Sequence, residues 1–343
     1  MPEIKKILVI RIRAFGDTLL TTPTLRGLKK AYPQAKLTVL VEPSIAVILK
    51  GLPYVDEILT FDRQGSKKGG WWPELKANLK FWRQLRALHY DLVVDVLGTP
   101  RTAWMALATG AKIRVGFAFR VRKWAYTLVH QPSKERKYIA DYTADALRVL
   151  GHQPDSLKLD FVVPPESKAR ARDFMERMGW FGAKPLIVQA AGGWELKRYP
   201  EGQLAEAVRQ IVAAKARPVL YLWGPGEEDM ASRLLKLAGV EGVLAPKTDF
   251  ADMGALLELG ALLLTNDNAT KHLAVAVGCP TLTVFGPTSD IAWHPPADPM
   301  HRSVKLSLDC MPCEQLVCPL GTHECMLGLA PSVVASAALE MLA

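Results

Sequence analysis

The sequence has no uninterrupted apolar run of the ~18 residues that a helix needs to cross a bilayer. Its start, MPEIKKILVI, has too short an apolar stretch for a secretory signal peptide, and it lacks a cleavage site of small residues. Short-period repeats and low-complexity tracts are also missing. These absences argue against an integral membrane protein and an exported protein, and they predict a folded protein of the cytoplasm.

Two ligand-binding motifs are absent as well. No complete Gly-x-Gly-x-x-Gly fingerprint follows the first predicted strand, which disfavours a nicotinamide-dependent dehydrogenase. The sequence also has no Asp-x-Asp pair suited to holding a divalent ion. We therefore expect chemistry that needs no metal and no cofactor for catalysis.

The charge is unevenly distributed along a chain that is long enough, at 343 residues, for two domains. Residues 1–165 hold 27 Lys and Arg against 14 Asp and Glu, whereas residues 166–343 hold 16 against 20. The basic first half favours an anionic partner such as a phosphorylated lipid surface, an acidic sugar or a nucleic acid. A solvated basic surface that serves only solubility is the alternative.

Short apolar runs alternate with helical patterns in both halves, which predicts parallel sheets built from βα units. Strands are expected at residues 6–12, 36–42, 91–98, 185–193, 217–226, 260–267 and 280–287, and helices at 18–31, 201–214 and from 227. Paired prolines within 159–167 indicate a linker. We predict an α/β protein with two doubly wound, Rossmann-like domains that face each other across a cleft.

Polar residues gather where the predicted strands end, which is where open parallel sheets bind ligands. In RAFGD, Asp17 falls in the first turn of a helix, where it either complements the helix dipole or acts as a general base. In LWGPGEED, Glu227 either accepts hydrogen bonds from a ribose or merely begins a helix. In GGWELKRYP, the glycines let the backbone approach a ligand, and Lys197 and Arg198 suit a diphosphate; a solvated loop is the alternative.

A further group of candidates lies at the start of a predicted helix in TNDNATKHLAVAV: Asp267, Asn268, Thr270, Lys271 and His272. We expect Asn268 and Thr270 to cap this helix, whose free N–H groups form an anion site. Lys271 and His272 are expected to add positive charge there, although His272 can equally be a structural histidine.

Taken in order, these segments resemble glycosyltransferase family nine, the bacterial ADP-heptose:lipopolysaccharide heptosyltransferases. The resemblance covers nearly the whole chain and rests on RAFGDTLLTTPTLRGLKKAYPQAKL, YDLVVDVLG, RVGF, LKRYP, LWGPGEED, TNDNATKHLAVAVGCPTLTVFGPT and CMPCEQLVCPLGTHECM. It implies a GT-B fold with an acceptor-binding domain over 1–165 and a nucleotide-sugar-binding domain over 166–330. It also implies a last helix over 331–343 that packs back on the first domain.

The resemblance assigns roles to individual residues. Asp17 matches the family's proposed base, Lys197 its phosphate-binding lysine, and Glu227 or Glu228 its acid on the nucleotide side. Asp267 matches an acid that faces the donor sugar or its diphosphate.

One position departs from the family pattern. The family usually has Ser or Thr followed by Gly after the acid that Asp267 matches, whereas this chain has Asn268 and Ala269. Alanine tolerates a positive φ poorly. Either the local backbone therefore differs from that of the family, or the donor lies slightly further out. This leaves the identity of the donor base open.

The implied reaction is inverting transfer of a heptose from ADP-heptose to a lipopolysaccharide inner-core acceptor. Asp17 would deprotonate the acceptor hydroxyl. Lys197, Arg198 and the helix N-terminus after Asn268 would neutralise the departing ADP, so that no metal ion is needed.

Basic and aromatic residues are interleaved in 63–86 and 117–126. This composition favours anionic lipid headgroups and acidic core sugars, and hence a peripheral location at the cytoplasmic face of the inner membrane. Binding of single-stranded nucleic acid is the alternative and is not expected. The chain is expected to be a monomer. The acceptor-binding candidates are Lys67, Lys68, Arg120, Arg122 and Lys123.

Four cysteines near the end, Cys310, Cys313, Cys318 and Cys325, have the spacing C-x2-C-x4-C-x6-C, with His323 between the last two. In a cytoplasmic chain such a cluster indicates either a structural metal site or four reduced, partly buried thiols. No metal ligand for catalysis is assigned.

Three other functions fit parts of the sequence. The same fold could use another nucleotide-sugar, or it could be a nucleotide-sugar epimerase, which would turn over the donor without an acceptor. A basic module that binds membranes or nucleic acid is the non-enzymatic alternative, and its binding would not depend on Asp17.

Overall fold

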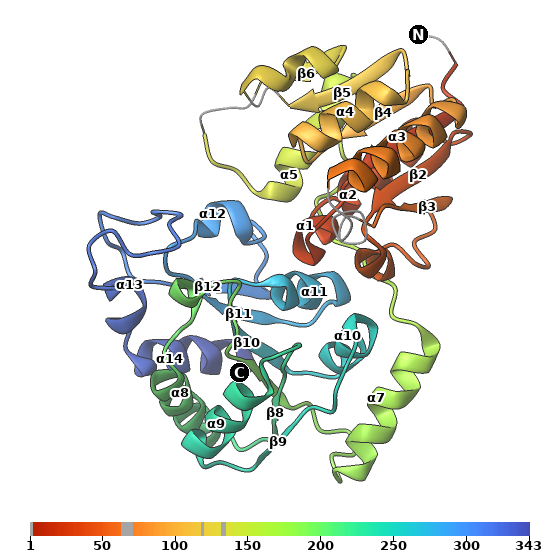
Figure 1. Cartoon of the computed structure of the whole chain (residues 1–343). Coiled ribbons are helices and arrows are strands. Elements are labelled where there is room, and N and C mark those ends of the chain that lie inside the picture. The colour runs from red at the N-terminus through yellow and green to blue at the C-terminus, as the bar shows by residue number, and fades with distance from the viewer. Residues whose placement is uncertain (1–2, 63–70, 118–119, 132–134) are drawn as a thin grey trace. The chain divides into compact units, whose positions relative to one another are not determined.

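The computed structural model describes residues 3–62, 71–117, 120–131 and 135–343. The chain divides into two compact units, Met1–Val162 and Val163–Ala343 (Figure 1). Each unit has one six-stranded sheet in which all paired strands run parallel. The predicted α/β class with two doubly wound halves is therefore confirmed, and the boundary falls inside the predicted linker.

The first unit has the strand order β3-β2-β1-β4-β5-β6. Its elements are β1 (Lys6–Ile10), α1 (Phe15–Leu19), α2 (Thr22–Ala31), β2 (Lys36–Val41), η1 (Pro43–Ile48), β3 (Glu57–Thr60), α3 (Trp71–Ala87), β4 (Leu92–Asp95), α4 (Pro100–Ala108), β5 (Ile113–Phe117), η3 (Arg120–Ala125), β6 (Leu128–His130), α5 (Ile139–Thr143) and α6 (Asp145–Val149). Helices α2, α5 and α6 contact one another, and α3, α4 and η3 form a second group.

The second unit has the strand order β12-β11-β10-β7-β8-β9. Its elements are α7 (Pro165–Arg177), β7 (Leu186–Gln189), η4 (Glu195–Lys197), α8 (Glu201–Ala214), β8 (Val219–Tyr221), α9 (Glu228–Ala238), β9 (Gly242–Leu244), α10 (Phe250–Glu258), β10 (Leu262–Asn266), α11 (Ala269–Val277), β11 (Thr281–Val284), α12 (Asp290–Trp293), β12 (His301–Val304), α13 (Glu324–Leu327) and α14 (Pro331–Leu342). In Figure 1, α8, α9 and α14 lie side by side, and α14 packs mainly against α8. Packing of this last helix on the first unit stays a prediction.

The strands at the centre of each sheet are buried except for Lys6 at the start of β1, as expected for sheets with helices on both faces. Every residue of β7, β10 and β11 is buried, including the polar ends Gln189 and Asn266. These three strands are neighbours in register. The loops that follow them therefore emerge side by side at one edge of the second sheet.

The helix expected over 18–31 is two helices, α1 and α2. The second begins at Thr22, and Pro23 occupies its first turn, where the missing N–H of proline costs nothing. The Thr22 hydroxyl donates to Leu19 O at 2.7 Å, which satisfies a carbonyl at the break.

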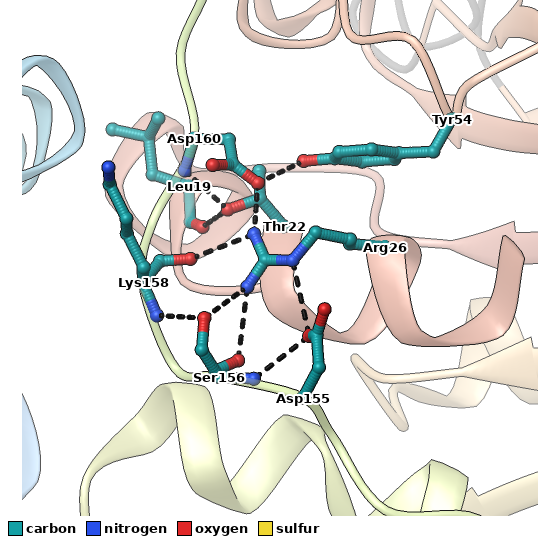
Figure 2. A network of polar contacts seen from close by, with 8 residues as sticks. All are labelled: Leu19, Thr22, Arg26, Tyr54, Asp155, Ser156, Lys158 and Asp160. Atoms are coloured by element: carbon teal, nitrogen blue, oxygen red, sulfur yellow. Dashed lines mark hydrogen bonds and ion pairs between the residues drawn. The ribbon is translucent and has the colours of Figure 1, made fainter. Parts of the chain in front are cut away.

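The last segment of the first unit is held against α2 by one arginine, as Figure 2 shows. Arg26 donates to the Ser156 hydroxyl at 2.8 Å and to Lys158 O at 3.2 Å, and it pairs with Asp155 and Asp160. Tyr54 donates to the same Asp160 carboxylate at 2.8 Å. A segment without helix or strand is thus fixed by polar contacts to α2 and to the turn before β3.

Candidate functional site

The candidate site of the second unit lies at the carboxyl ends of β7, β10 and β11. It consists of the loop after β7, which carries η4, the loop between β10 and α11, and the loop after β11. Sequence positions 197, 267 and 288 meet here because the three strands are adjacent and parallel. Each loop contributes at least one polar side chain.

Asp267 is the centre of this site. Its carboxylate accepts hydrogen bonds from Lys197 Nζ at 2.7 Å, from Lys271 Nζ at 2.7 Å and from the Thr288 hydroxyl at 2.9 Å. Its side chain is only 4% exposed. Burial raises the pKa of Asp267, but the two lysines outweigh burial and hold it far below its usual range. The carboxylate is therefore ionised at any physiological pH.

The lysine clamp around Asp267 carries one positive charge in excess, since two ammonium groups share one carboxylate. Lys271 is fully buried, and its Nζ also donates to Trp293 O at 2.7 Å. Lys197 lies over the Trp194 ring, with Nζ 4.0 Å from the ring centroid. Of the two lysines, Lys197 is the more exposed, at 10% against 0%. The excess charge is therefore accessible to a ligand mainly through Lys197.

The N-terminus of α11 adds a second source of positive potential. Asn268 caps this helix, as predicted, because its Oδ1 accepts the N–H of Lys271 at 3.0 Å. Its amide nitrogen donates to Ala191 O at 2.8 Å, which ties the cap to the loop after β7. Thr270 does not cap the helix, since it lies inside it and its hydroxyl donates to Met253 Sδ. A donor contact through Thr270 stays a prediction.

The departure at Ala269 is explained by the backbone. Ala269 is the first helical residue of α11, and Asn268 before it has an extended φ of −152°. A helix start of this kind needs no residue with positive φ, so glycine is not required. Alanine in place of the family's usual glycine at residue 269 therefore gives no reason to expect a different backbone at the N-terminus of α11.

The loop after β7 favours glycine at residue 192. A Cβ on Gly192 would lie 3.1 Å from Lys197 Cβ and 3.3 Å from the carbonyl carbon of Lys197. Gly192 thus lets the loop fold closely over η4, which carries Lys197. The Nε of Arg198, the next cation, is buried without a hydrogen-bond partner.

Of the two roles foreseen for His272, the structure favours the structural, uncharged one, while a contact with the donor stays a prediction. The ring is buried, and burial together with the neighbouring lysines lowers its pKa well below the usual value. His272 is therefore neutral near pH 7, as a structural histidine would be. Burial also lowers the pKa of Lys271, but its ion pair with Asp267 opposes this.

Glu227 lies at the start of α9 after β8, the strand next to β7. Its Oε2 accepts the N–H of Gly224 at 2.8 Å, so the carboxylate closes the turn that precedes the helix. The structural role foreseen as the alternative is therefore present. A contact with the nucleotide stays a prediction.

In the first unit, Asp17 lies in the first turn of α1, as predicted. It pairs with Arg11, which sequence reasoning missed, with 2.6 Å between Arg11 Nη2 and Asp17 Oδ2. Arg11 is buried beyond the end of β1, and its Nη1 donates to Val96 O at 3.3 Å. Burial lowers the pKa of Arg11, and Asp17 and Asp95 oppose this. One oxygen of the candidate base is thus held by a fixed guanidinium.

Asp95 is a second acid that the sequence analysis did not single out. It ends β4, beside β1, and is fully buried. It accepts the N–H groups of Leu97 and Gly98, each at 3.0 Å, and the Tyr126 hydroxyl at 2.7 Å. Burial raises its pKa, and these hydrogen bonds oppose the increase. The acid in DLVVD was the signal that could have identified it.

Comparison with known proteins gives the family. The family model described as glycosyltransferase family 9 (heptosyltransferase) matches residues 78–323, more than half of the chain. This chain belongs to glycosyltransferase family 9. The resemblance noted in the sequence is thereby confirmed.

Individual relatives of this family 9 chain agree. Lipopolysaccharide heptosyltransferase 3 of Escherichia coli is 27% identical over 292 residues, which cover 83% of this chain and 84% of that protein. Lipopolysaccharide heptosyltransferase 1 of Pseudomonas aeruginosa is 25% identical over 299 residues, covering 83% and 79%.

Solved structures confirm the fold. A family 9 glycosyl transferase of Veillonella parvula has a TM-score of 0.85 at 20% identity and covers 100% of this chain and 98% of that one. E. coli heptosyltransferase WaaC with ADP-2-deoxy-2-fluoro heptose has a TM-score of 0.71 at 20% identity, covering 98% and 99%. The GT-B type predicted for the chain is therefore confirmed, while a cleft between the two units stays a prediction.

The acceptor-binding candidates of the family 9 chain are described only in part. Lys67 and Lys68 lie outside the described residues, as do the side chains of Arg120 and Arg122. Lys123 is exposed beside Trp124. None of the described helices is long and apolar enough to span a membrane.

The folded chain is expected to lose stability in mild acid because His294 takes up a proton more readily when the chain is unfolded. Burial lowers the pKa of His294 to about 4, and its hydrogen bond to His301 O only partly opposes this. Between about pH 6.5, the usual pKa of histidine in an unfolded chain, and about pH 4, the pKa of folded His294, the unfolded chain binds a proton that the folded chain does not. Stability is therefore complete above pH 6.5 and decreases as the pH falls towards 4.

The substitution His294→Gln should reduce this acid-dependent loss. Urea unfolding near pH 7.5 and pH 5 gives the loss for each variant. The exposed His89, replaced by asparagine because its φ of 52° suits that residue, is the control. An equal loss in wild type and His294→Gln would contradict the assignment.

Proposed function

We propose that this family 9 chain transfers a heptose from ADP-heptose to an inner-core lipopolysaccharide acceptor, with inversion at the anomeric carbon. The names of its relatives support the sugar and the acceptor class. WaaC, which shares the fold, has been solved with ADP and with an ADP-heptose analogue, which supports the donor class.

The observation that carries the proposal is the lysine clamp at the start of α11. A departing nucleoside diphosphate accumulates negative charge on its terminal phosphate, and a preorganised cationic site stabilises that charge most where water is excluded. Lys197 offers the accessible part of the excess charge, and the helix N–H groups lie beside it. Lys271 acts through Asp267, since its own Nζ is buried and bonded.

Asp17 is the proposed general base. Its carboxylate is partly exposed at 27%, so that an acceptor hydroxyl can reach it. Arg11 holds Oδ2 and thereby fixes the plane in which the carboxylate accepts the proton. Arg11 is a positioning residue in this mechanism.

The acceptor is proposed to approach the basic, aromatic part of the first unit at the cytoplasmic face of the inner membrane. Trp82, Trp104 and Trp124 come from α3, α4 and η3. The rings of Trp82 and Trp104 stack with centroids 6.2 Å apart, and Trp124 contacts Trp104 edge-on at 4.9 Å. Trp104 and Trp124 are each 48% exposed. Half-exposed indoles beside the exposed Lys123 suit a headgroup layer.

Transfer without a metal ion at the reacting atoms is part of the proposal. The lysine clamp supplies the positive charge that a divalent ion would otherwise supply. The iron-containing glycosyltransferase TibC of enterotoxigenic E. coli has a TM-score of 0.57 at 13% identity, which shows a shared fold alone.

The test is transfer by the purified full chain from ADP-heptose to inner-core lipopolysaccharide fragments, with NMR to compare the anomeric configurations of donor and product. Lys197→Met should lower kcat/KM by roughly 10²–10³-fold, and the exposed Lys184→Met should not. ADP-heptose should raise Tm in wild type and Lys184→Met but not in Lys197→Met.

Other outcomes identify the alternatives. A Tm response to a UDP-sugar alone would indicate a different donor. Donor conversion without acceptor would indicate an epimerase. Retention of anomeric configuration would exclude the inverting mechanism.

A further inference from the structure

The segment between β12 and α13 has no secondary structure of its own. It runs from residue 305 to 323, which is long for an irregular connection inside a compact domain. Several of its apolar side chains face solvent, since Leu316 is 67% exposed, Val317 79% and Leu320 63%. Leu306, Leu308 and Met311 pack against the hydrophobic core of the second unit. Burial of apolar surface therefore fixes the start of the segment far more than residues 314–322, which are mostly exposed.

The four cysteines of this region meet at one cavity. Cys310, Cys313 and Cys318 come from the irregular segment and Cys325 from α13, and all four line the same hollow. All four are free thiols. The rest of the lining is largely apolar and includes Leu196, Pro287 and Leu308.

The backbone turns sharply after two of these cysteines. Glu314, directly after Cys313, has a φ of 55°, and Gly321, three residues after Cys318, has a φ of 68°. The N–H of His323 points at Cys318 Sγ from 3.4 Å, and those of Leu320, Gly321 and Thr322 also point towards it. Successive backbone N–H groups that converge on one point form a concavity of the kind found around metal–sulfur and anion sites.

We propose that Cys310, Cys313, Cys318 and Cys325 together bind one thiophilic divalent transition-metal ion, Zn²⁺ or Fe²⁺, in tetrahedral coordination. Four thiolates suit these ions, and C-x2-C followed by a second pair of cysteines is a spacing that structural sites use. Among the described residues, no group of three His, Cys, Asp or Glu is already arranged to hold a metal ion. The proposed site therefore forms when the thiols turn into the shared cavity, and binding orders the segment.

His323 is not one of the proposed ligands. Its Nε2 is 2.8 Å from Leu196 O, so this nitrogen is the donor of that hydrogen bond. The histidine instead ties the cysteine segment to η4. Four sulfur ligands complete a tetrahedron without it.

The metal would support two loops of the candidate donor site, the one that carries Lys197 and the one that carries Thr288. His323 bonds to Leu196, the residue before Lys197. Glu314 donates its N–H to Pro287 O at 2.9 Å, and its Oε1 accepts the N–H of Ser289 at 3.1 Å, on either side of Thr288. The ion would be structural, and its loss would loosen the loops that hold Lys197 and Thr288. This last consequence rests on the proposed function, but metal binding itself does not.

The direct test is the metal content of the full chain, purified under reducing conditions after growth with zinc and iron, by plasma mass spectrometry. We expect one equivalent of zinc or iron in wild type and in Cys279→Ala, whose buried thiol lies elsewhere. We expect loss of that equivalent in Cys310→Ser/Cys313→Ser. A strong chelator should lower Tm in the first two proteins and not in the third.

A second measurement does not depend on the folding of a variant. Wild type stripped of metal and titrated with Co²⁺ should develop thiolate-to-cobalt charge-transfer bands and intense tetrahedral visible bands, saturating at one equivalent. Wild type that binds neither zinc, iron nor cobalt, or a serine variant with as much metal as Cys279→Ala, would overturn the proposal. Intact metal binding in a chain that does not transfer heptose would reject only the proposed function.

Discussion

Replacing Asp267 by alanine is expected to destabilise the second unit by about 3–5 kcal/mol, the usual cost of removing one partner from a buried ion pair. The alanine leaves Lys197 and Lys271 facing each other without the carboxylate that both contact at 2.7 Å. Lys271 has no route to water, since its side chain is fully buried. The Thr288 hydroxyl loses its acceptor as well.

Urea unfolding of wild type and Asp267→Ala near pH 7 measures the loss. Asp173→Ala, which removes an exposed carboxylate from α7, is the matched control and should change stability by less than about 0.5 kcal/mol. Lys271→Met in the Asp267→Ala background should recover part of the loss, because it removes the buried ammonium and keeps most of the volume. Additive effects of the two substitutions would contradict the ion pair.

Much of the fold could be predicted from the sequence because its central strands and its helices have strong local signals. The helix expected at 201–214 is α8, residue for residue. Two strands that were not predicted, β6 and β9, are three-residue strands at the sheet edges, and all their residues are only partly buried. A three-residue strand with partly exposed side chains has no distinct hydrophobic pattern.

The site could be predicted in outline for a topological reason. Since parallel strands direct their carboxyl ends to one edge, the polar residues after β7 and β10 were expected to meet, and Lys197 and Asp267 do. Their burial could not be predicted, because it depends on the Trp194 and Trp293 rings around Lys197. Arg11 was missed because KILVIRI reads as one strand, whereas β1 ends at Ile10.

Asp17→Asn is expected to lower kcat by about 10²–10⁴-fold while KM for ADP-heptose changes little, because the amide cannot accept the proton of the acceptor hydroxyl. Arg11→Met should also lower kcat, by a smaller factor, because the carboxyl group of Asp17 remains but loses the guanidinium 2.6 Å from Oδ2. Arg11→Lys keeps a cation without the planar fork and should fall between Arg11→Met and wild type.

The kcat and KM of each variant, measured with saturating acceptor, separate positioning from binding. Arg13→Met is the matched control, since Arg13 is exposed two residues from Arg11. Urea unfolding of all variants identifies losses of activity that come only from unfolding. If Arg11→Met raised KM for the acceptor at unchanged kcat, Arg11 would bind the acceptor and would not orient the base. An Asp17→Asn variant with wild-type kcat would require a different base.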